Sequence, residues 1–473
     1  PYDDGEPAWS PDGRYLAFTS NRTADPDANQ NTDIFVVEAR PGQTPRAITS
    51  SPGADASPAW SPDGRAVAYV AGGAPEDIWY APSSVGVVPF DPATGTAGAP
   101  KLLTASLDRN VASPRYSPDG KAIYFLLEDG GNSHLASVPA AGGAVTRVVS
   151  GERDVSAFDV GRKGELIVLE SVTERPPEVS RVGASGALDR LTHTNDALLK
   201  DVQVAQVKRF KAKSADGTLV DGFLTLPPGA PAGKLPTILR IHGGPAAQFS
   251  TAFEPEWQLL AAHGYAVVAA NPRGSTGYGR AFSRAIWADW GNKDYDDVMA
   301  AVDQAIAMGV ADPDRLGVGG WSYGGILTDH VITKTNRFKA ATSGASEVNY
   351  LANYGTDHDQ YEWEAELGLP WRNTDLWMKL SPWFRIEKVT TPTLVLGGSE
   401  DVNVPVLNGE QLYQALRRLG RDTELVIYPG EHHGFRKPSY IKDRYERYLA
   451  WYGKYLKGEG KGEPEPAKAA GKP

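Results

Sequence analysis

The first 195 or so residues repeat one pattern of apolar and polar positions. Residues 8–20 (AWSPDGRYLAFTS), 59–71 and 115–127 each lead from an aromatic segment through Ser-Pro-Asp-Gly into a segment of alternating apolar and polar residues. Proline presets such a turn, aspartate caps it and glycine adopts the positive φ, so each copy predicts a β-hairpin. Residues 158–170 form a degenerate fourth copy.

Two further short apolar segments follow these hairpins. The third-strand candidates begin at residues 33, 77 and 134, and the closing strands read PRAIT, KLLT, TRVVS and LDRLT. Four strands in about 45 to 55 residues is the period of β-propeller blades. We therefore expect residues 1–198 to form about four β-propeller blades, with a β-sandwich as the alternative.

The start of the chain bears on whether such a propeller closes. Four blades are the fewest that close one, and Pro1 stands just ahead of the first hairpin. This favours a partial, N-terminally truncated propeller over a closed four-bladed ring. The other blades would be missing or would lie on a separate N-terminal propeller fragment acting as a partner. Targeting information would be lost with the start, so a cytoplasmic and an exported protein both stay open.

From about residue 199 the pattern changes to alternating strands and helices. Residues 210–227 predict a hairpin that turns at Asp216-Gly217. Apolar strands are then predicted at 237–242, 265–271, 315–321, 338–344, 391–398 and 423–429, with helical periodicity near 254–263, 294–308, 324–335, 406–419 and 438–456. This alternation indicates a mostly parallel sheet covered on both faces, an α/β-hydrolase domain over 199–457. Residues 458–473 are rich in Gly, Pro and Lys and predict a disordered tail.

Composition narrows the classes of function. The chain has 473 residues, a net charge of −10 and no cysteine, and its pI is about 5.4. The negative charge argues against nucleic acid or an anionic membrane as the main partner. The absence of cysteine excludes disulfides, thiolate nucleophiles and zinc–thiolate sites. Peptide substrates and a homo-oligomer remain open.

The second half carries the parts of a serine hydrolase in the required order. Gly320-Trp321-Ser322-Tyr323-Gly324 is a G-x-S-x-G pattern between an apolar strand and a helix. Asp401 follows a later strand, with Glu400 as its competitor, and the pair His432-His433 follows the last strand. This is the Ser, acid, His order of α/β-hydrolases. The residues alone leave open which histidine is the base, since adjacent side chains usually point apart.

A loop rich in glycine supplies a further element of acyl-transfer chemistry. The stretch RIHGGP (240–245) ends an early predicted strand, where a backbone N–H can reach a substrate oxyanion, with the Tyr323 N–H as second donor. His242 precedes Ser322, which is the wrong order for the base, so we interpret it as part of the loop structure. The adjacent histidines are unsuited to a metal ion, and neither a metal nor a cofactor is expected.

Taken together, these motifs resemble the prolyl oligopeptidase family of serine peptidases. HGGP, NPRGSTGYG (271–279), GWSYGG, GSEDVNVP and GEHHGF carry the resemblance, which covers the whole chain. It implies Ser322 as nucleophile, Asp401 as orienting acid, His433 as base, and the N–H groups of Gly244 and Tyr323 as oxyanion donors. The acylaminoacyl-peptidase and dipeptidyl-peptidase branches are the most similar. An esterase with the same triad and an inactive propeller scaffold are the alternatives.

Specificity is the least determined property. The aromatic and acidic stretch 349–371 lies between the nucleophile and the acid, and in similar proteins it helps to line the pocket beside the scissile bond. Candidate pocket residues are Tyr323, Tyr354, Tyr361, Trp363, Val404 and Arg273. Packing within an irregular cap is the competing interpretation of the aromatic residues, and bracing of its own loop is that of Arg273.

Overall fold

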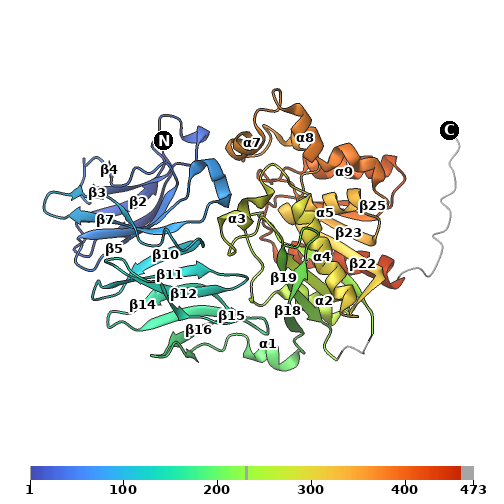
Figure 1. The fold of residues 1–473 in the computed structure, drawn as a ribbon, viewed down its shortest axis with the longest axis horizontal. Coiled ribbons are helices and arrows are strands. Elements are labelled where there is room, and N and C mark those ends of the chain that lie inside the picture. The colour runs from blue at the N-terminus through green and yellow to red at the C-terminus, as the bar shows by residue number, and fades with distance from the viewer. Residues whose placement is uncertain (1, 230–232, 460–473) are drawn as a thin grey trace.

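The computed structural model describes residues 2–229 and 233–459, which form two lobes (Figure 1). Antiparallel sheets make up one lobe, and a mixed sheet covered by helices makes up the other. A short helix, α1 (Asp196–Asp201), lies between them in the sequence. The predicted disordered tail falls, from residue 460 onward, outside the described residues.

The first lobe consists of four antiparallel units that follow one another along the chain. The first two are β1 (Asp4–Trp9), β2 (Tyr15–Ser20), β3 (Asp33–Glu38) and β4 (Arg46–Ala47), then β5 (Asp55–Trp60), β6 (Ala66–Ala71), β7 (Ser84–Asp91), β8 (Thr96–Ala97) and β9 (Lys101–Leu102). The others are β10 (Val111–Tyr116), β11 (Ala122–Glu128), β12 (Ser133–Pro139) and β13 (Thr146–Val149), then β14 (Asp154–Val160), β15 (Leu166–Val172), β16 (Arg175–Val182) and β17 (Leu188–Arg190). One parallel bridge, Ser133 to Asp154, joins the last two units.

The predicted hairpin turns are confirmed and share their geometry. In the first, the Ser10 hydroxyl donates to Asp12 Oδ1 at 2.6 Å, and the Tyr15 amide donates to Ser10 Oγ at 2.9 Å. Gly13 takes a φ of 69°, which costs glycine little because it has no Cβ. The same serine–aspartate bond of 2.6 Å recurs in the second and third copies. Identical turn chemistry therefore starts the second strand of three units.

The expected third strand at residue 77 is wrong. Residues Pro75–Tyr80 form a 3-10 helix, η2, and the third strand of this unit is β7. Proline at the first helical position favours this start. Tyr80 is buried in the core of the second lobe, where its hydroxyl donates to Glu366 Oε1 at 3.2 Å and accepts from Trp290 Nε1 at 2.8 Å. The aromatic residues that resemble a strand are thus an anchor between the lobes.

The second lobe is built on an eight-stranded sheet in the order β18-β19-β21-β20-β22-β23-β24-β25. The strands are β18 (Gln206–Lys213), β19 (Leu219–Leu226), β20 (Leu235–Ile241), β21 (Ala266–Asn271), β22 (Ala311–Trp321), β23 (Phe338–Gly344), β24 (Thr393–Gly398) and β25 (Thr423–Tyr428). The strands from β21 to β25 in this order pair in parallel. The predicted turn at Asp216-Gly217 joins the antiparallel pair β18–β19.

Helices cover both faces of this sheet, as its long apolar strands require. The helices are α2 (Pro255–Ala262), α3 (Arg280–Ser283), α4 (Lys293–Ala307), α5 (Tyr323–Lys334), α6 (Tyr350–Asn353), α7 (Gln360–Leu367), α8 (Thr374–Leu380), α9 (Leu407–Arg418) and α10 (Pro438–Tyr452). Apolar residues of α4, α5 and α9 form the core on one face. Those of α2 and α10 form the core on the other. All five predicted helices are present, while α3 and α6–α8 were not predicted.

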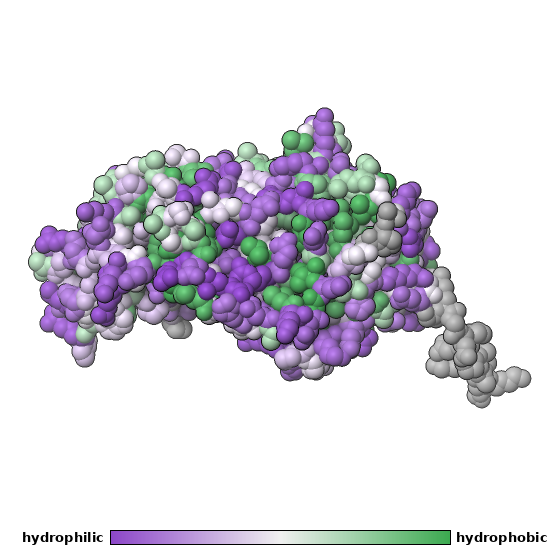
Figure 2. Space-filling model, turned by 90° about the horizontal axis from the view of Figure 1, so that it is seen from below, coloured by the Kyte–Doolittle hydropathy of each residue, from purple (hydrophilic) through white to green (hydrophobic). Residues whose placement is uncertain are grey.

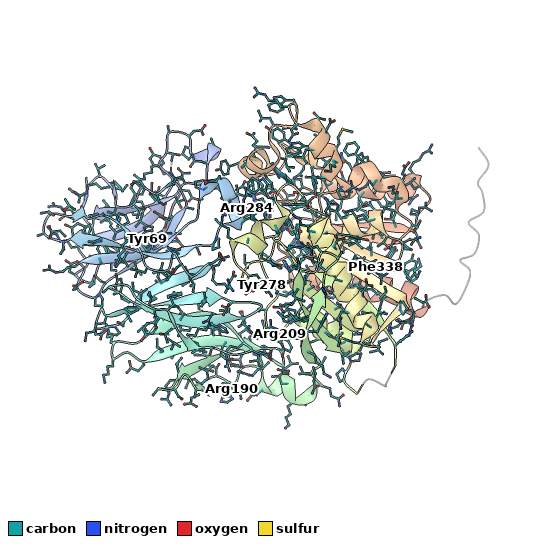
Figure 3. All side chains as sticks on the ribbon, viewed as in Figure 1. Tyr69, Arg190, Arg209, Tyr278, Arg284 and Phe338 are labelled. Atoms are coloured by element: carbon teal, nitrogen blue, oxygen red, sulfur yellow. The ribbon has the colours of Figure 1, made fainter. Side chains whose placement is uncertain are left out.

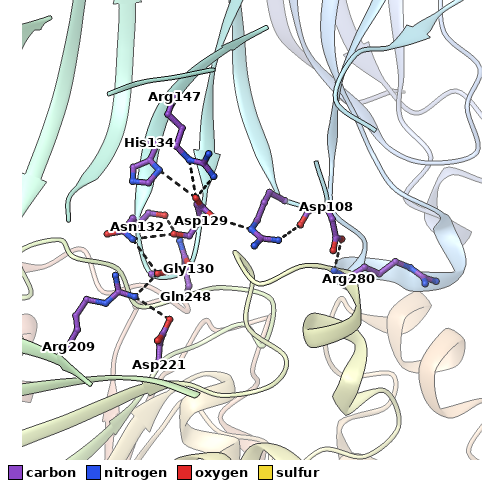
Figure 4. A network of polar contacts seen from close by, with 12 residues as sticks. Asp108, Asp129, Gly130, Asn132, His134, Arg147, Arg209, Asp221, Gln248 and Arg280 are labelled. Carbon is purple, nitrogen blue, oxygen red and sulfur yellow. Dashed lines mark hydrogen bonds and ion pairs between the residues drawn. The ribbon is translucent and has the colours of Figure 1, made fainter. Parts of the chain in front are cut away.

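A polar loop at residues 129–132 joins the two lobes (Figure 4). The Gly131 amide donates to Gln248 Oε1 at 2.9 Å, and Gln248 Nε2 donates to the Asn132 carbonyl at 3.0 Å. Arg209 Nη2 donates to the Gly130 carbonyl at 2.7 Å, and Figure 3 places Arg209 between the lobes. Asp129 holds the loop from the other side through Arg109 and Arg147.

The surface seen from below carries hydrophobic areas on both lobes with hydrophilic residues between them (Figure 2). No helix in residues 2–229 and 233–459 combines the length and the apolar character needed to cross a bilayer.

Replacing Tyr80 by Phe tests the anchor between the lobes. The substitution keeps the ring but leaves buried groups of Glu366 and Trp290 without one partner. We expect a loss of roughly 1–3 kcal/mol in the free energy of unfolding, measured by urea denaturation. Tyr124→Phe is the control, because Tyr124 is only partly buried and its hydroxyl makes no hydrogen bond with the described residues. Equal stability of the two variants would contradict the anchoring role.

Candidate functional site

Ser322 occupies a sharp turn between β22 and α5. Its φ of 61° and ψ of −130° are rare for a residue with a Cβ. Two glycines make the turn sterically feasible: a Cβ at Gly320 would lie 2.4 Å from the Gly324 carbonyl carbon, and one at Gly324 would lie 2.2 Å from the Ile241 oxygen. The flanking glycines of the motif are therefore required by packing, and they lift Ser322 above the end of the sheet.

Asp401 and His433 form a hydrogen-bonded pair. His433 Nδ1 lies 2.8 Å from Asp401 Oδ2. The Asp401 carboxylate is buried, and its other oxygen accepts the amides of Asn403 at 3.0 Å and Val404 at 2.8 Å. These bonds compensate the lost hydration of the carboxylate and direct Oδ2 to the imidazole. Since Asp401 occupies Nδ1, the Nε2 atom of His433 is left for another partner.

The three loops converge at the carboxyl ends of β22, β24 and β25. The Glu400 amide donates to the Glu431 carbonyl at 2.9 Å, which joins the aspartate and histidine loops. Trp321 Nε1 donates to the His433 carbonyl at 2.9 Å, which ties the histidine loop to the residue before Ser322. The Ser322 hydroxyl makes no hydrogen bond with the described residues, and catalytic contacts often tighten only once substrate is bound.

Glu400 and His432 differ clearly from their neighbours Asp401 and His433. Both are exposed, and neither enters the hydrogen bond that joins the buried acid to the imidazole. The geometry therefore separates the two members of each adjacent pair, which the residues alone could not do.

The loop after β20 lies directly against the serine. A Cβ at Gly243 would lie 3.4 Å from Ser322 Cβ, and Gly244 takes a φ of 120°, where a Cβ would lie 2.7 Å from the Ala246 nitrogen. The backbone of Gly244 requires glycine, whereas a Cβ at Gly243 would make only an ordinary van der Waals contact with the nucleophile. The donors expected at Gly244 and Tyr323 remain predictions, placed on a loop and a helix start that meet at Ser322.

His242 supports this loop, as its position in the sequence indicates. It is buried, its Nε2 lies 2.9 Å from Ser275 Oγ and its Nδ1 lies 2.6 Å from the Gly243 carbonyl. Burial lowers the pKa of His242 to about 4, so the ring is neutral at pH 7.

Three of the expected pocket residues face protein partners instead of an open pocket. The Tyr323 ring packs edge-on against Trp290 with centroids 5.2 Å apart, and its hydroxyl donates to Asp294. Arg273 is buried and paired with Asp297 at 2.7 Å, so it braces its loop. Trp363 lies in the core and donates to Asp357. Burial and these partners favour packing and bracing roles for the three residues, and their role in the substrate pocket stays a prediction.

The other three pocket candidates keep partly accessible or site-adjacent positions. Tyr354 is half-buried and donates to Glu364 at 2.8 Å. Tyr361 lines a cavity of about 150 Å³ together with residues of the first two antiparallel units. Val404 is buried, and its amide contacts the Asp401 carboxylate. Their role in substrate binding remains a prediction.

Sequence reasoning missed two residues that position the site. Asp294, fully buried on α4, accepts the Tyr323 hydroxyl and the Gly291 amide, while burial raises its pKa to about 6. Asn403 links Asp401 to Asp359, since its amide donates to Asp401 and its Nδ2 donates to Asp359 Oδ2 at 2.8 Å. Asn403 lies within the quoted acid motif, whereas Asp294 is distant in sequence and gives no such signal.

Side chains able to hold a metal do not converge in the described part of the chain. No group of three or more His, Asp and Glu residues there has a geometry suited to a metal ion.

Comparisons with known proteins agree with this arrangement. The profile of the prolyl oligopeptidase family matches residues 251–459. The uncharacterized peptidase YuxL of Bacillus subtilis is 33% identical over 96% of this chain and 71% of its own length. Dipeptidyl-peptidase 5 of Porphyromonas gingivalis is 27% identical over 95% of this chain and 66% of its own.

A solved structure shares the fold of both lobes. The acylaminoacyl peptidase of Pyrococcus horikoshii superposes with a TM-score of 0.83 at 24% identity, covering 97% of this chain and 72% of that one. The serine turn, the buried acid–histidine pair, the family profile and the similarity to YuxL all lead to one conclusion. This chain belongs to the prolyl oligopeptidase family of serine peptidases.

Proposed function

We propose that the protein hydrolyses short peptides through an acyl-enzyme formed on Ser322. The observation that carries this proposal is the 2.8 Å bond between Asp401 and His433 beside the strained serine turn. A serine hydroxyl becomes an effective nucleophile only when an oriented base takes its proton. The buried carboxylate holds the His433 ring in one orientation and leaves Nε2 to act on Ser322.

The reaction follows from these positions. His433 removes the Ser322 proton as Ser322 attacks the scissile carbonyl, and the imidazolium is stabilised by Asp401. The developing oxyanion is bound by the N–H groups of Gly244 and Tyr323. His433 then gives the proton to the departing amine, and water releases the acyl group by the same steps in reverse order. No cofactor takes part in this scheme.

The proteins that this chain resembles support two candidate substrate classes. Similarity to the Pyrococcus acylaminoacyl peptidase supports the release of blocked amino-terminal residues. Similarity to dipeptidyl-peptidase 5 over 95% of the chain supports the release of dipeptides as the second candidate. The triad would cleave esters as well. A higher rate of hydrolysis for peptides than for matched esters distinguishes a peptidase from an esterase. An inactive scaffold is disfavoured because the strained serine turn and the buried acid–histidine pair are both present.

The first lobe is proposed to be part of a β-propeller. In this proposal its four antiparallel units are propeller blades within residues 1–198. The catalytic domain of residues 199–457 follows them. Successive units pack through three apolar clusters, first on second, second on third and third on fourth. In residues 2–229 and 233–459 no such cluster joins the first unit to the fourth, which favours an open arc over a closed ring.

Replacing Ser322 by Ala is expected to lower kcat by at least about a thousandfold, because the acyl-enzyme cannot form. The variant should keep its circular dichroism spectrum and melting temperature, since only one oxygen is lost. Ser185→Ala, in an exposed turn of the first lobe, is the control. Activity within tenfold of the unmodified protein would refute the assignment of the nucleophile.

The adjacent histidines provide a matched pair for the base. His433→Ala should reduce kcat as strongly as the loss of Ser322, because no other described imidazole contacts Asp401. His432→Ala should stay within a few-fold of the unmodified protein, since His432 is exposed. Steady-state hydrolysis of a peptide anilide measures both. The reverse result would assign the base to His432.

The adjacent acids test the orienting group in the same way. Asp401→Asn should lower kcat by roughly ten-thousandfold, because the amide favours the wrong imidazole tautomer. Glu400→Gln should have little effect, since the Glu400 side chain is exposed. Both are compared by kcat at saturating substrate. Comparable losses in the two variants would show that local charge, rather than the Asp401–His433 bond, supports catalysis.

A further inference from the structure

Four acidic side chains gather beside the Asp401–His433 pair without a cationic partner. They are Glu347, Asp357, Asp359 and Glu362, all between β23 and the middle of α7. No lysine or arginine nitrogen of the described residues lies within 4 Å of their carboxylate oxygens, and the one ionic contact joins Asp359 Oδ1 to His358 Nε2 at 3.5 Å. Most buried carboxylates elsewhere in proteins are paired, so this group is unusual.

Hydrogen bonds connect this acidic group to the catalytic pair. Asn403 donates through Nδ2 to Asp359 and through its amide to Asp401, which in turn holds His433. The side chains of Asp359 and His433 are equally accessible, each with 27% of its surface exposed. Asp359 is thus linked to His433 through Asn403 and Asp401, and the Asp359 and His433 side chains are both partly exposed.

Behind Asp359, Glu347 is buried and Asp357 is half-buried, and both accept hydrogen bonds from neutral donors only. Asn353 Nδ2 donates to Glu347 Oε1 at 2.7 Å and also to Asp357, which accepts Trp363 Nε1 at 2.7 Å. Burial, reinforced by the charges of the neighbouring acids, raises the pKa of Glu347 well above its usual range.

Glu362 is the member with an unpaired carboxylate oxygen. Only 2% of it is exposed, yet its Oε1 atom has no hydrogen-bond partner among the described residues. Burial raises the pKa of Glu362, and the charges of Asp359 and Asp357 add to that rise because these acids lie near it. An unpaired buried carboxylate is costly, and a bound cation would offset that cost.

We propose that Glu347, Asp357, Asp359 and Glu362 form a subsite for a protonated nitrogen of the peptide substrate. That nitrogen is the free α-ammonium group of a short peptide or the side chain of a lysine or arginine next to the scissile bond. A metal ion fits less well, since these acids are not arranged as metal ligands in the described residues. The subsite rests on the proposed peptidase function and narrows it to cationic substrates.

Two matched pairs of p-nitroanilides test the subsite in the unmodified protein. Ala-Leu-anilide is compared with its N-acetyl form, and acetyl-Ala-Lys-anilide with the uncharged acetyl-Ala-norleucine-anilide. We expect one cationic member to exceed its neutral partner by roughly 10- to 100-fold in kcat/KM, the range of a hydrogen-bonded charge. Preference in the first pair identifies the α-ammonium group, and preference in the second identifies the basic side chain.

Variants then locate the preference. Asp359→Asn and Glu362→Gln should each reduce the cationic-to-neutral ratio at least fivefold, chiefly through KM. Asp375→Asn, which changes an exposed acid on the nearby helix α8, should preserve the ratio. A ratio near one in both pairs of the unmodified protein overturns the subsite, and so does a ratio that survives both substitutions. Absence of hydrolysis of all four anilides would instead overturn the proposed peptidase function.

Discussion

The close contact of β22, α5 and β20 is the constraint on which the site depends. Gly320 and Gly324 meet without room for a side chain, and Gly324 also touches the carbonyl of Ile241. The chain can turn from strand to helix in this space only through the strained backbone of Ser322. The serine, the glycine loop after β20 and the start of α5 consequently meet at one point.

Charge burial organises the rest of the site. Removing a carboxylate from water costs several kcal/mol unless hydrogen bonds replace the lost hydration. Asp401 recovers this cost through two amides and the imidazole, and Asp294 recovers it through the Tyr323 hydroxyl and two amides. The acids around Glu362 have fewer hydrogen bonds to offset the cost of their burial. This difference separates the proposed ligand-binding acids from Asp401 and Asp294, whose hydrogen bonds brace the site.

The two lobes share one core at their contact. Tyr80 of the first lobe is buried between Trp290 and Glu366, so the helix α7 packs against a residue more than 280 positions earlier in the chain. Because α7 also carries Glu362 and follows Asp359, the first lobe helps to set the position of the acidic group. Substrate recognition and the packing of the lobes are therefore coupled through this helix.

The sequence by itself determined the local elements and the order of the catalytic parts. Turn residues and apolar periodicity depend on neighbours in the chain, so the hairpins, the parallel strands and the positions of Ser322, Asp401 and the histidine pair could be predicted. Tertiary structure decided everything that depends on distant partners. It buried Tyr323, Trp363 and Arg273, turned residues 75–80 into an anchor helix, and joined Asp401 to His433 instead of His432. Burial and side-chain direction arise only when segments far apart in the chain pack together, and no local pattern encodes them.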